Sequence, residues 1–212
     1  MKIGVVSIQG DVSEHLDMLT QAFSDAGIKA TGVCVKRPHD MDGVSGLVLP
    51  GGESTTISKL MVQFGLFDEI LKRVETDDLP ILGTCAGCIL LAKHGDTEVA
   101  KTKTRLLSLM DMKVDRNAYG RQSDSFESPI SFRPENGPTK RADAGLDFKR
   151  PFNAVFIRAP RIIETYGHCK VLCVREKEIL AAQEGRRVAL TFHPELTGDS
   201  RIHRYFLNLA IK

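Results

Sequence analysis

The sequence predicts an α/β fold in which a parallel sheet carries helices on both faces. Two observations support this prediction. Short apolar runs alternate with helix-like segments through the first half of the chain, and glycine-rich turns follow two of these runs. Such alternation is typical of strand–helix–strand units, whose strands run parallel. The 212 residues fit one domain and are enough to bury a substantial core.

The elements of the first half follow from local patterns. Residues 2–8 read as a buried strand. Residues 12–27 carry apolar side chains at spacings of three and four, which predicts an amphipathic helix that Gly27 caps. Another helix is expected over 55–75, with a break or bend at Gly65. Further strands are expected at 30–35, 45–50 and 79–85, and a further helix at 86–94.

The second half is richer in strand signals. Apolar runs predict strands at 111–116, 128–132, 153–160, 169–175, 178–183 and 187–194. A final amphipathic helix is expected over 201–211. The polar segment 131–151, which contains Pro134, Gly137 and Pro138, reads as an inserted loop.

Composition and charge exclude several classes of protein. The 29 basic and 27 acidic residues nearly balance, and a net charge of +2 gives no reason to expect nucleic acid as a partner. No apolar run is long enough to span a membrane, and an acidic residue follows the first apolar run too soon for a secretory signal. Five cysteines, an odd number, favour a reduced and cytoplasmic compartment.

The most informative motif is GTCAGC at 83–88. An apolar strand ends at Gly83, Cys85 stands at the turn, and Ala86 and Gly87 open a helix with almost no side-chain bulk. In G-x-S-x-G elbows a serine occupies this place, where a strained turn exposes the nucleophile. Backbone N–H groups and the helix dipole would favour the thiolate of Cys85, and the N–H of Ala86 would be a natural donor to an oxyanion.

A cysteine nucleophile needs a base, and TFHPEL at 191–196 offers one. His193 and Glu195 lie at the end of an expected strand. Residues two apart in a strand share one face, so we expect Glu195 to approach the imidazole. Its carboxylate would then fix the tautomer and position of His193, as in a nucleophile–base–acid triad.

Two other interpretations of the cysteines stay open on the residues alone. Cys85 and Cys88 have the C-x-x-C spacing of a redox pair, and a zinc site would combine them with Cys169 and Cys173. The long separation of the two pairs is unlike a compact zinc ribbon. We expect Cys169 and Cys173 to point the same way into the core, and Cys34 and Cys88 to be packing residues.

A second glycine turn, LPGGEST at 49–55, also follows a strand. Gly51 and Gly52, just before a helix start, would form a nest of backbone donors that holds a carboxylate or completes an oxyanion hole. An ordinary tight turn with a capping side chain is the simpler interpretation of this segment alone. Segments 114–127 and 156–160 each place an arginine near a strand end, where it can pair with a carboxylate.

Taken together, these motifs resemble those of class I glutamine amidotransferases, which use a Cys-His-Glu triad. The order of LPGGES, GTCAG and HPE carries the resemblance. The segments IQGDVSEH, RNAYGRQSDSFE, FIRAP and FHPELTGD narrow it to the glutaminase subunits of pyridoxal 5′-phosphate synthase. The resemblance covers residues 3–207. It implies a three-layer, flavodoxin-like α/β fold with a mixed, mostly parallel sheet, in a single glutaminase domain over 1–212.

The resemblance also implies roles for the matching residues. Cys85 would attack the side-chain amide of glutamine, His193 would shuttle the proton, and Glu195 would orient His193. The implied glutamine contacts are Gly52, Glu53, Ser54, Arg116, Ile157 and Arg158. The implied oxyanion-hole and activation residues are Gly51, Gly52, Ala86 and Gln9.

The resemblance further implies a partner and no cofactor. Ammonia would pass to a (β/α)₈-barrel synthase subunit in a large hetero-oligomer, and docking of that subunit would activate the glutaminase. The synthase would combine the ammonia with a pentose phosphate and a triose phosphate. No metal, nucleic acid or membrane is implied. Two alternatives remain, which are a glutaminase subunit of another amidotransferase and a non-catalytic interaction or redox module on the same scaffold.

Overall fold

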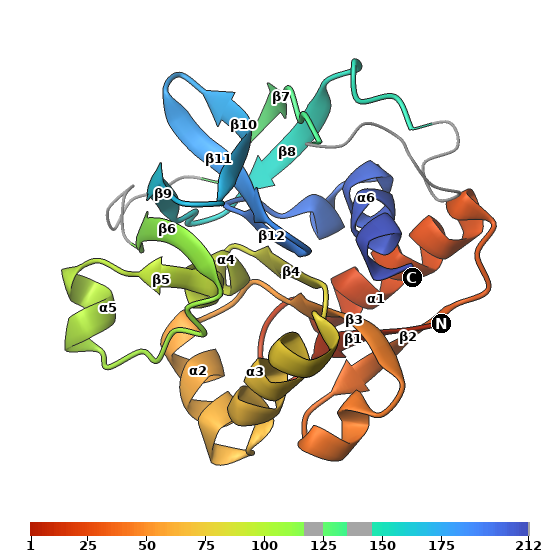
Figure 1. Cartoon of the computed structure of the whole chain (residues 1–212). Helices are drawn as coiled ribbons and strands as arrows, with labels where there is room; N and C mark the ends of the chain where they lie inside the picture. Colours follow the sequence, from red (N-terminus) through yellow and green to blue (C-terminus); the bar gives the residue numbers. More distant parts are fainter. Residues whose placement is uncertain (117–124, 135–145, 212) are drawn as a thin grey trace.

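The computed structural model describes residues 1–116, 125–134 and 146–211. Within them, a mixed and mostly parallel sheet forms the centre of the molecule (Figure 1). Its strand order is β2-β1-β3-β4-β12-β11-β9-β6-β5, with β10 paired to β11. The strands from β2 to β12 in this order run parallel, whereas β11 is antiparallel to both of its neighbours and to β10. Strands β7 and β8 form a separate antiparallel pair. The α/β fold expected from the sequence is confirmed.

The strands are β1 (Lys2–Val6), β2 (Thr31–Val35), β3 (Val44–Leu49), β4 (Ile81–Thr84), β5 (Ala92–His94), β6 (Met110–Asp115), β7 (Phe126–Ile130), β8 (Phe152–Phe156), β9 (Arg161–Thr165), β10 (Lys170–Arg175), β11 (Glu178–Glu184) and β12 (Arg187–Leu190). The helices are α1 (Val12–Ala26), α2 (Ser54–Gln63), α3 (Leu66–Asp77), α4 (Ala86–Leu91), α5 (Thr97–Lys101) and α6 (Arg201–Ala210), with 3-10 helices at Pro38–Met41 and Pro194–Leu196.

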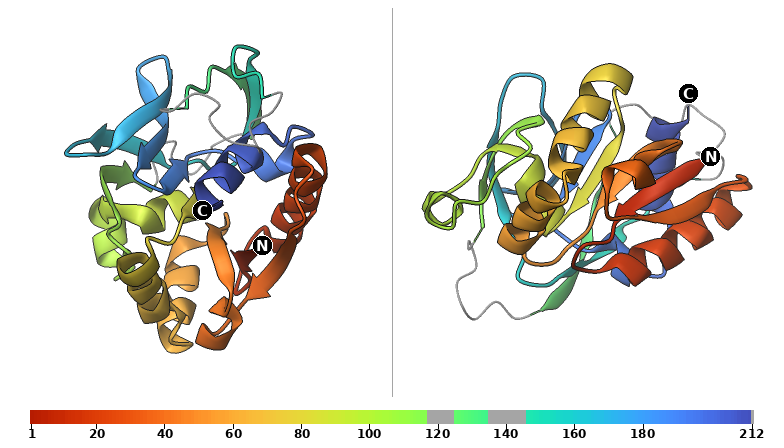
Figure 2. Two further views of the ribbon diagram at one scale, coloured as in Figure 1. Left: turned by 45° about the vertical axis from the view of Figure 1, so that its right-hand side comes forward. Right: turned by 90° about the horizontal axis from the view of Figure 1, so that it is seen from below.

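Alternating side chains of the sheet face two apolar cores. In β1, Val6 packs into the core beneath α2, α3 and α4, whereas Val5 packs into the core beneath α1 and α6. Successive strand residues point to opposite faces, so an entirely apolar strand can serve both cores. Figure 2 shows α1 and α3 on opposite sides of the parallel strands. These are the three layers expected from the sequence.

Two glycines end or divide helices as expected. Gly27 adopts the left-handed conformation, with φ 62°, and its N–H caps α1 by bonding to the carbonyls of Phe23 and Ser24. Gly65, with φ 72°, separates α2 from α3. A left-handed residue at this point turns the chain, so the predicted long helix is two helices with a break between them.

Some expectations are wrong. The helix expected over 86–94 ends at Leu91, because the chain then pairs as β5 with β6, with Ala92 opposite Met110. Cys34 is exposed and does not pack in the core, because β2 is the edge strand of the sheet. Helix α5 and strand β9 were not expected at all.

Cys169 and Cys173 are both buried, as expected, but they do not point the same way. Cys169 belongs to the core beneath α2, α3 and α4, and Cys173 belongs to the core beneath α1 and α6. Cys169 lies in the turn before β10, and the pairing register of β10 with β11 shifts on both sides of Cys173. Period-two alternation therefore does not hold between them.

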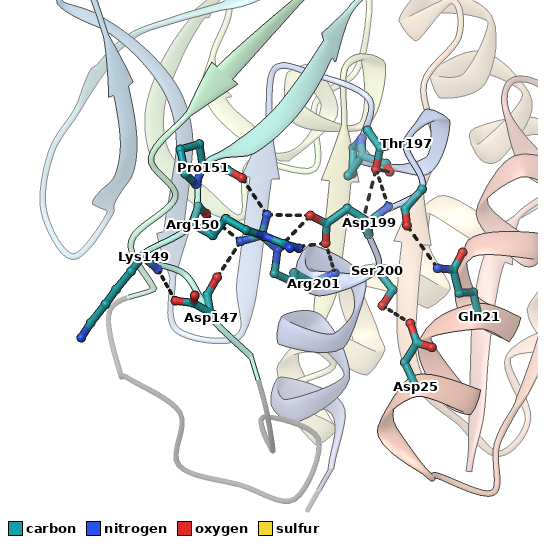
Figure 3. A network of polar contacts seen from close by, with 12 residues as sticks. Gln21, Asp25, Asp147, Lys149, Arg150, Pro151, Thr197, Asp199, Ser200 and Arg201 are labelled. Atoms are coloured by element: carbon teal, nitrogen blue, oxygen red, sulfur yellow. Dashed lines mark hydrogen bonds and ion pairs between the residues drawn. The ribbon is translucent and has the colours of Figure 1, made fainter.

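A buried arginine ties together the start of α6 and the segment before β8 (Figure 3). The Arg201 guanidinium donates to the carbonyls of Asp147 at 2.6 Å, Arg150 at 2.7 Å and Pro151 at 2.9 Å, and it pairs with Asp199 at 2.6 Å. A charged side chain can be buried when its donors are satisfied and its charge is paired. The end of the polar segment expected over 131–151 is thereby fixed, whereas residues 135–145 lie outside the described residues.

Candidate active site

Cys85 occupies a sharp turn between β4 and α4. Its backbone has φ 47° and ψ −101°, a conformation that residues other than glycine rarely adopt. The Cys85 N–H donates to the carbonyl of Leu190 at 2.9 Å, and the carbonyl of Cys85 accepts from Ile89. These bonds hold the turn in place. Strain kept at a single residue by its surroundings is typical of functional sites, and this turn has the form expected of a nucleophile elbow.

The glycines on either side of Cys85 allow this close packing. A Cβ at Gly83 would lie 2.6 Å from the carbonyl oxygen of Gly87, and a Cβ at Gly87 would lie 2.1 Å from the carbonyl oxygen of Leu49. Both distances are shorter than any stable contact, so no larger residue fits without movement of the backbone. The G-x-C-x-G pattern is therefore required by the packing of β3, β4 and α4.

His193 follows β12 and is hydrogen-bonded to Glu195. The imidazole Nδ1 lies 2.7 Å from Glu195 Oε1, and both residues are buried. The pair forms as expected, although the reason given from the sequence is wrong. Pro194–Leu196 is a 3-10 helix and not a continuation of the strand, so its tight turn brings the two side chains together. Nδ1 donates to the carboxylate, and Nε2 makes no hydrogen bond among the described residues.

The electrostatics of this pair favour a positive imidazole next to a thiol. Burial alone would lower the pKa of His193, but polar contacts with Asp11, Cys85 and Glu195, together with the charge on Glu195, raise it above its usual range. Burial raises the pKa of Glu195, while its hydrogen bond with His193 acts against that rise. The imidazole can thus accept a proton and retain it, as a thiolate–imidazolium pair requires.

The second glycine turn lies at the end of the neighbouring strand, β3. A Cβ at Gly51 would lie 2.5 Å from Cε1 of His193, so the turn packs directly against the imidazole. Gly52 has φ 141°, and a Cβ there would meet Gln9 Oε1 at 2.6 Å. That oxygen accepts a hydrogen bond of 2.9 Å from the N–H of Glu53. The Gln9 side chain therefore occupies one backbone donor of the turn.

Arg116 and Glu53 form an ion pair at the rim of the site. The Arg116 guanidinium also donates to Thr55 Oγ1 at 2.7 Å, and Glu53 caps α2 by accepting from the N–H groups of Thr55 and Thr56. Partial burial opposes ionisation of Glu53, but the bonds from Thr56 and Thr55 and the charge of Arg116 lower its pKa to about 2. Residues 117–124 of the RNAYGRQSDSFE motif lie outside the described residues.

A pocket of about 480 Å³ joins these parts. Its lining includes every site residue expected from the sequence except Gly51 and Glu195, which lie behind the wall. The lining residues are Gln9, Asp11, Gly52, Glu53, Ser54, Cys85, Ala86, Ile89, Arg116, Ile157, Arg158 and His193. Sequence reasoning missed Asp11, whose carboxylate lies 3.4 Å from His193 Nδ1. The IQGDVSEH motif contains this residue, but no spacing rule connects it to a histidine so far along the chain.

The structure opposes the redox and zinc interpretations of the cysteines. Burial raises the pKa of the Cys88 thiol far above its usual range, which makes it a poor redox or metal-binding group. Within the described ranges, the one cluster of potential metal ligands is Asp11, His193 and Glu195. The hydrogen bond between His193 and Glu195 accounts for this closeness without an ion. None of the helices in the described part of the chain has the length and apolar character needed to cross a bilayer.

Comparison with known proteins agrees with this geometry. Residues 5–212 match the SNO glutamine amidotransferase family. The chain is 47% identical to the pyridoxal 5′-phosphate synthase subunit PdxT of Methanosarcina acetivorans, over 100% of this chain and 99% of that protein. It is 45% identical to PdxT of Pyrococcus furiosus over the full length of both. A crystal structure of a glutamine amidotransferase superposes with a TM-score of 0.79 at 39% identity and covers 98% of both chains. The chain belongs to the SNO glutamine amidotransferase family.

Proposed function

We propose that this protein hydrolyses L-glutamine to L-glutamate and ammonia, as the glutaminase subunit of pyridoxal 5′-phosphate synthase in vitamin B6 biosynthesis. One observation carries the proposal above the others. Cys85, on a strained turn with φ 47°, shares a pocket with the buried His193, and Nδ1 of His193 is hydrogen-bonded to the Glu195 carboxylate. This is the arrangement that a nucleophile, its base and the orienting acid require.

In the first half of the reaction, Cys85 Sγ attacks the side-chain amide carbon of glutamine. His193 takes the thiol proton, and Glu195 stabilises the resulting imidazolium through Nδ1. When the tetrahedral adduct collapses, the C–N bond breaks and His193 delivers the proton to the departing ammonia. A glutamyl thioester remains on Cys85.

In the second half, His193 removes a proton from water, which attacks the thioester. The thiolate leaves, glutamate is released, and the starting state returns. Every proton moves between side chains, substrate and water, so the scheme needs neither a metal nor a cofactor.

We assign the oxyanion to backbone donors of both glycine turns. The N–H of Ala86 follows the nucleophile directly, as in other elbows, and Gly51 and Gly52 supply the opposite side. Gln9 lies against this second side, because its Oε1 accepts from the N–H of Glu53. We propose that Gln9 connects the state of the turn with partner binding, which is the activation role that the resemblance implies.

Glutamine recognition falls to the residues around the pocket mouth. Gly52, Glu53, Ser54, Arg116, Ile157 and Arg158 all line it. Arg116 also pairs with Glu53 and donates to Thr55, so we assign it a second role in holding the turn. Arg158 is exposed, and we assign its guanidinium to the α-carboxylate of glutamine.

The partner is proposed from the relatives. PdxT proteins are named as subunits of pyridoxal 5′-phosphate synthase, and free ammonia is useful only if it reaches a synthase before it escapes to water. We propose a (β/α)₈-barrel synthase subunit as the receiver, in a large hetero-oligomer. A cytoplasmic location and a single glutaminase domain over 1–212 stay predictions.

The test is glutamate release from glutamine by the wild type and by Cys85→Ala, with and without the synthase subunit. The proposal expects activity that rises with the synthase and is absent in Cys85→Ala. Activity that depends on Cys85 but is indifferent to this synthase would keep the glutaminase and remove the pathway. Equal activity of the two proteins would overturn the proposal.

A further inference from the structure

A chain of buried polar side chains continues behind Glu195, away from the pocket. Glu195 Oε2 lies 3.4 Å from Nε2 of His15, which also lies 3.1 Å from Thr84 Oγ1. On the other side of the same ring, His15 Nδ1 lies 3.1 Å from His203 Nε2. His15, His203 and Thr84 have no exposed surface, and Glu195 is 5% exposed. Nothing in the proposed reaction uses either of these two histidines.

Burial favours the neutral form of both histidines. Burial, then the nearby His203 and His193, lower the pKa of His15 well below its usual value. Burial lowers the pKa of His203 to about 3. The titratable groups that face His15 are Glu195 from the 3-10 helix, His203 from α6 and His193. Each neutral ring carries one N–H and one lone pair, so the contacts decide which nitrogen holds the proton.

Two arrangements of these protons can be compared. If His15 Nδ1 carries the proton, it donates to His203 Nε2. The bare Nε2 of His15 then accepts from the Thr84 hydroxyl but also faces a carboxylate oxygen. His203 must bury an N–H at Nδ1, which has no partner among the described residues. If His15 Nε2 carries the proton, an N–H faces Glu195 and Thr84, and His203 Nε2 donates to His15 Nδ1. The unsatisfied atoms are then two acceptors, the Nδ1 lone pair of His203 and Glu195 Oε2, which lies 3.4 Å from His15 Nε2 without a hydrogen bond. The first arrangement costs more free energy, because it buries an unpaired N–H of His203 and directs a lone pair of His15 at the Glu195 carboxylate. The second arrangement is therefore favoured.

The fold holds this arrangement from outside. His15 lies in α1 and His203 in α6, and two polar contacts fix α1 to the segment that leads into α6 (Figure 3). Ser200 Oγ donates to Asp25 Oδ2 at 2.6 Å, and Gln21 Nε2 donates to the carbonyl of Gly198 at 3.2 Å. Thr84 immediately precedes the nucleophile in the chain. The position of His15 therefore depends on the same strand turn that sets Cys85.

We infer that His15 is a positioning residue for the glutaminase reaction. In its Nε2–H form it holds Glu195 ionised and turned toward His193, and His203 fixes that tautomer. This inference rests on the proposed function, because it extends the Cys85–His193–Glu195 triad by two neutral imidazoles. An N–H that faces a buried carboxylate favours its charged form. Without His15, Glu195 would bind a proton more readily and would support the imidazolium less well.

The test compares two amide substitutions at the same position. His15→Gln places its amide near the Nε2 position and retains a donor toward Glu195, whereas His15→Asn reaches only the Nδ1 position. Steady-state glutamate release is measured with the synthase subunit present, as kcat and KM across pH, and thermal unfolding verifies each fold. His39→Gln, at an exposed site, is the matched control and should behave as the wild type.

We expect His15→Asn to lower kcat by about 10- to 100-fold with little change in KM, because misplacement of a catalytic group costs rate and not affinity. The acid limb of its pH profile should move to higher pH, because the pKa of Glu195 rises. His15→Gln should keep kcat within about fivefold of the wild type, with the wild-type acid limb. A merely structural role would lower the unfolding temperature without separating the two variants or moving the pH profile.

Equal activity of His15→Asn and the wild type, or equal loss in both variants, would overturn the inference. If His15→Asn does not fold, His203→Leu supplies the test, since it removes the donor to His15 Nδ1. An unchanged acid limb in that variant would equally overturn the inference. Cys85→Ala in the same assay keeps the two proposals apart. An active Cys85→Ala removes the proposed function, whereas an inactive Cys85→Ala beside a fully active His15→Asn removes only the role of His15.

Discussion

Two glycine turns end the adjacent parallel strands β3 and β4, and they solve opposite problems. The turn after β4 presents a side chain, and it does so by holding Cys85 at φ 47°. The turn after β3 presents its backbone, and it uses Gly52 at φ 141°. The turn after β4 needs the side chain of Cys85, so a residue with a Cβ is kept there in a strained conformation. The turn after β3 needs only backbone N–H groups, so glycine can occupy it without strain.

The difference extends to how each turn is held. The turn after β4 is fixed by bonds within the sheet and by close contact of Gly87 with Leu49. The turn after β3 is held by a backbone bond from the Asp11 N–H to the Gly51 carbonyl and, in addition, by two side chains, Gln9 on one side and Arg116 on the other. The position of the nucleophile thus depends on the packing of the sheet, whereas the position of the donor turn also depends on two side chains.

The largest expected effect separates two cysteines that stand three residues apart. Cys85→Ala should lower glutamate release by at least about 10³-fold, since it removes the nucleophile. Cys88→Ala should stay within a few-fold of the wild type, because Cys88 is a fully buried packing residue. The measurement is synthase-activated glutaminase activity of both variants. Comparable losses would mean that the two cysteines act as a pair, and the elbow interpretation would fail.

The next effect tests the rigidity of the β4 turn. Gly87→Ala would place a Cβ 2.1 Å from the carbonyl oxygen of Leu49. We expect the free energy of unfolding to fall by about 1–3 kcal/mol, as in other overpacked cores. At this chain length that corresponds to a drop in Tm of roughly 2–12 °C. Gly198→Ala, where a Cβ would meet nothing within 4 Å, is the control. Equal Tm values for the two variants would show that the packing of Gly87 against Leu49 does not limit stability.

A smaller effect tests the β3 turn. Glu53→Ala removes the cap of α2 and the partner of Arg116, and loss of a cap costs about 0.5–2 kcal/mol. Chemical denaturation should show this loss at neutral pH. Glu75→Ala, on the exposed face of α3, should change the unfolding free energy far less. A loss from Glu53→Ala that exceeds the loss from Gly87→Ala would contradict the view that the turn after β4 is the more tightly packed of the two.

The smallest effect depends on pH. The pKa of Glu53 in the folded protein is lowered to about 2, so its charged form stabilises the fold above its ordinary pKa, near 4.5. This stabilisation declines as pH falls from about 5 toward 2. The difference in unfolding free energy between the wild type and Glu53→Gln should therefore shrink across that interval. We expect less than about 1 kcal/mol in total, since the side chain is 44% exposed and solvent screens its ion pair. A difference that grows on acidification would reverse the assigned sign.

Most of the fold could be predicted because its elements carry regular signals. Apolar strands, the helix in 12–27 and the break at Gly65 all follow from periodicity or from glycine. The three residues of β5 are too few to show a period, so the sequence predicts them as the end of the preceding helix. The exposure of Cys34 depends on which strand lies at the sheet edge, and local sequence does not encode that order.

Sequence motifs predict the residues that line the candidate site, but they do not predict the buried histidines behind it. Cys85 and His193 lie in recognisable turns at strand ends, and both line the pocket. His15 meets His203 across 188 positions of sequence, in a contact created by the packing of α1 against α6. Strand alternation predicts the pairing of Glu195 with His193. In the structure a 3-10 helix, and not a strand, brings the two side chains together.

The contact between Gly87 and Leu49 also limits how this scaffold can be redesigned. The close approach of α4 to β3 requires the absence of a methyl group at residue 87, because a Cβ there would lie 2.1 Å from the carbonyl oxygen of Leu49. Trimming side chains around the pocket would enlarge its mouth but leave that close approach unchanged. A library that aims at bulkier electrophiles therefore has to vary the strand spacing itself, whereas one that aims at different amino-acid tails need only vary the rim.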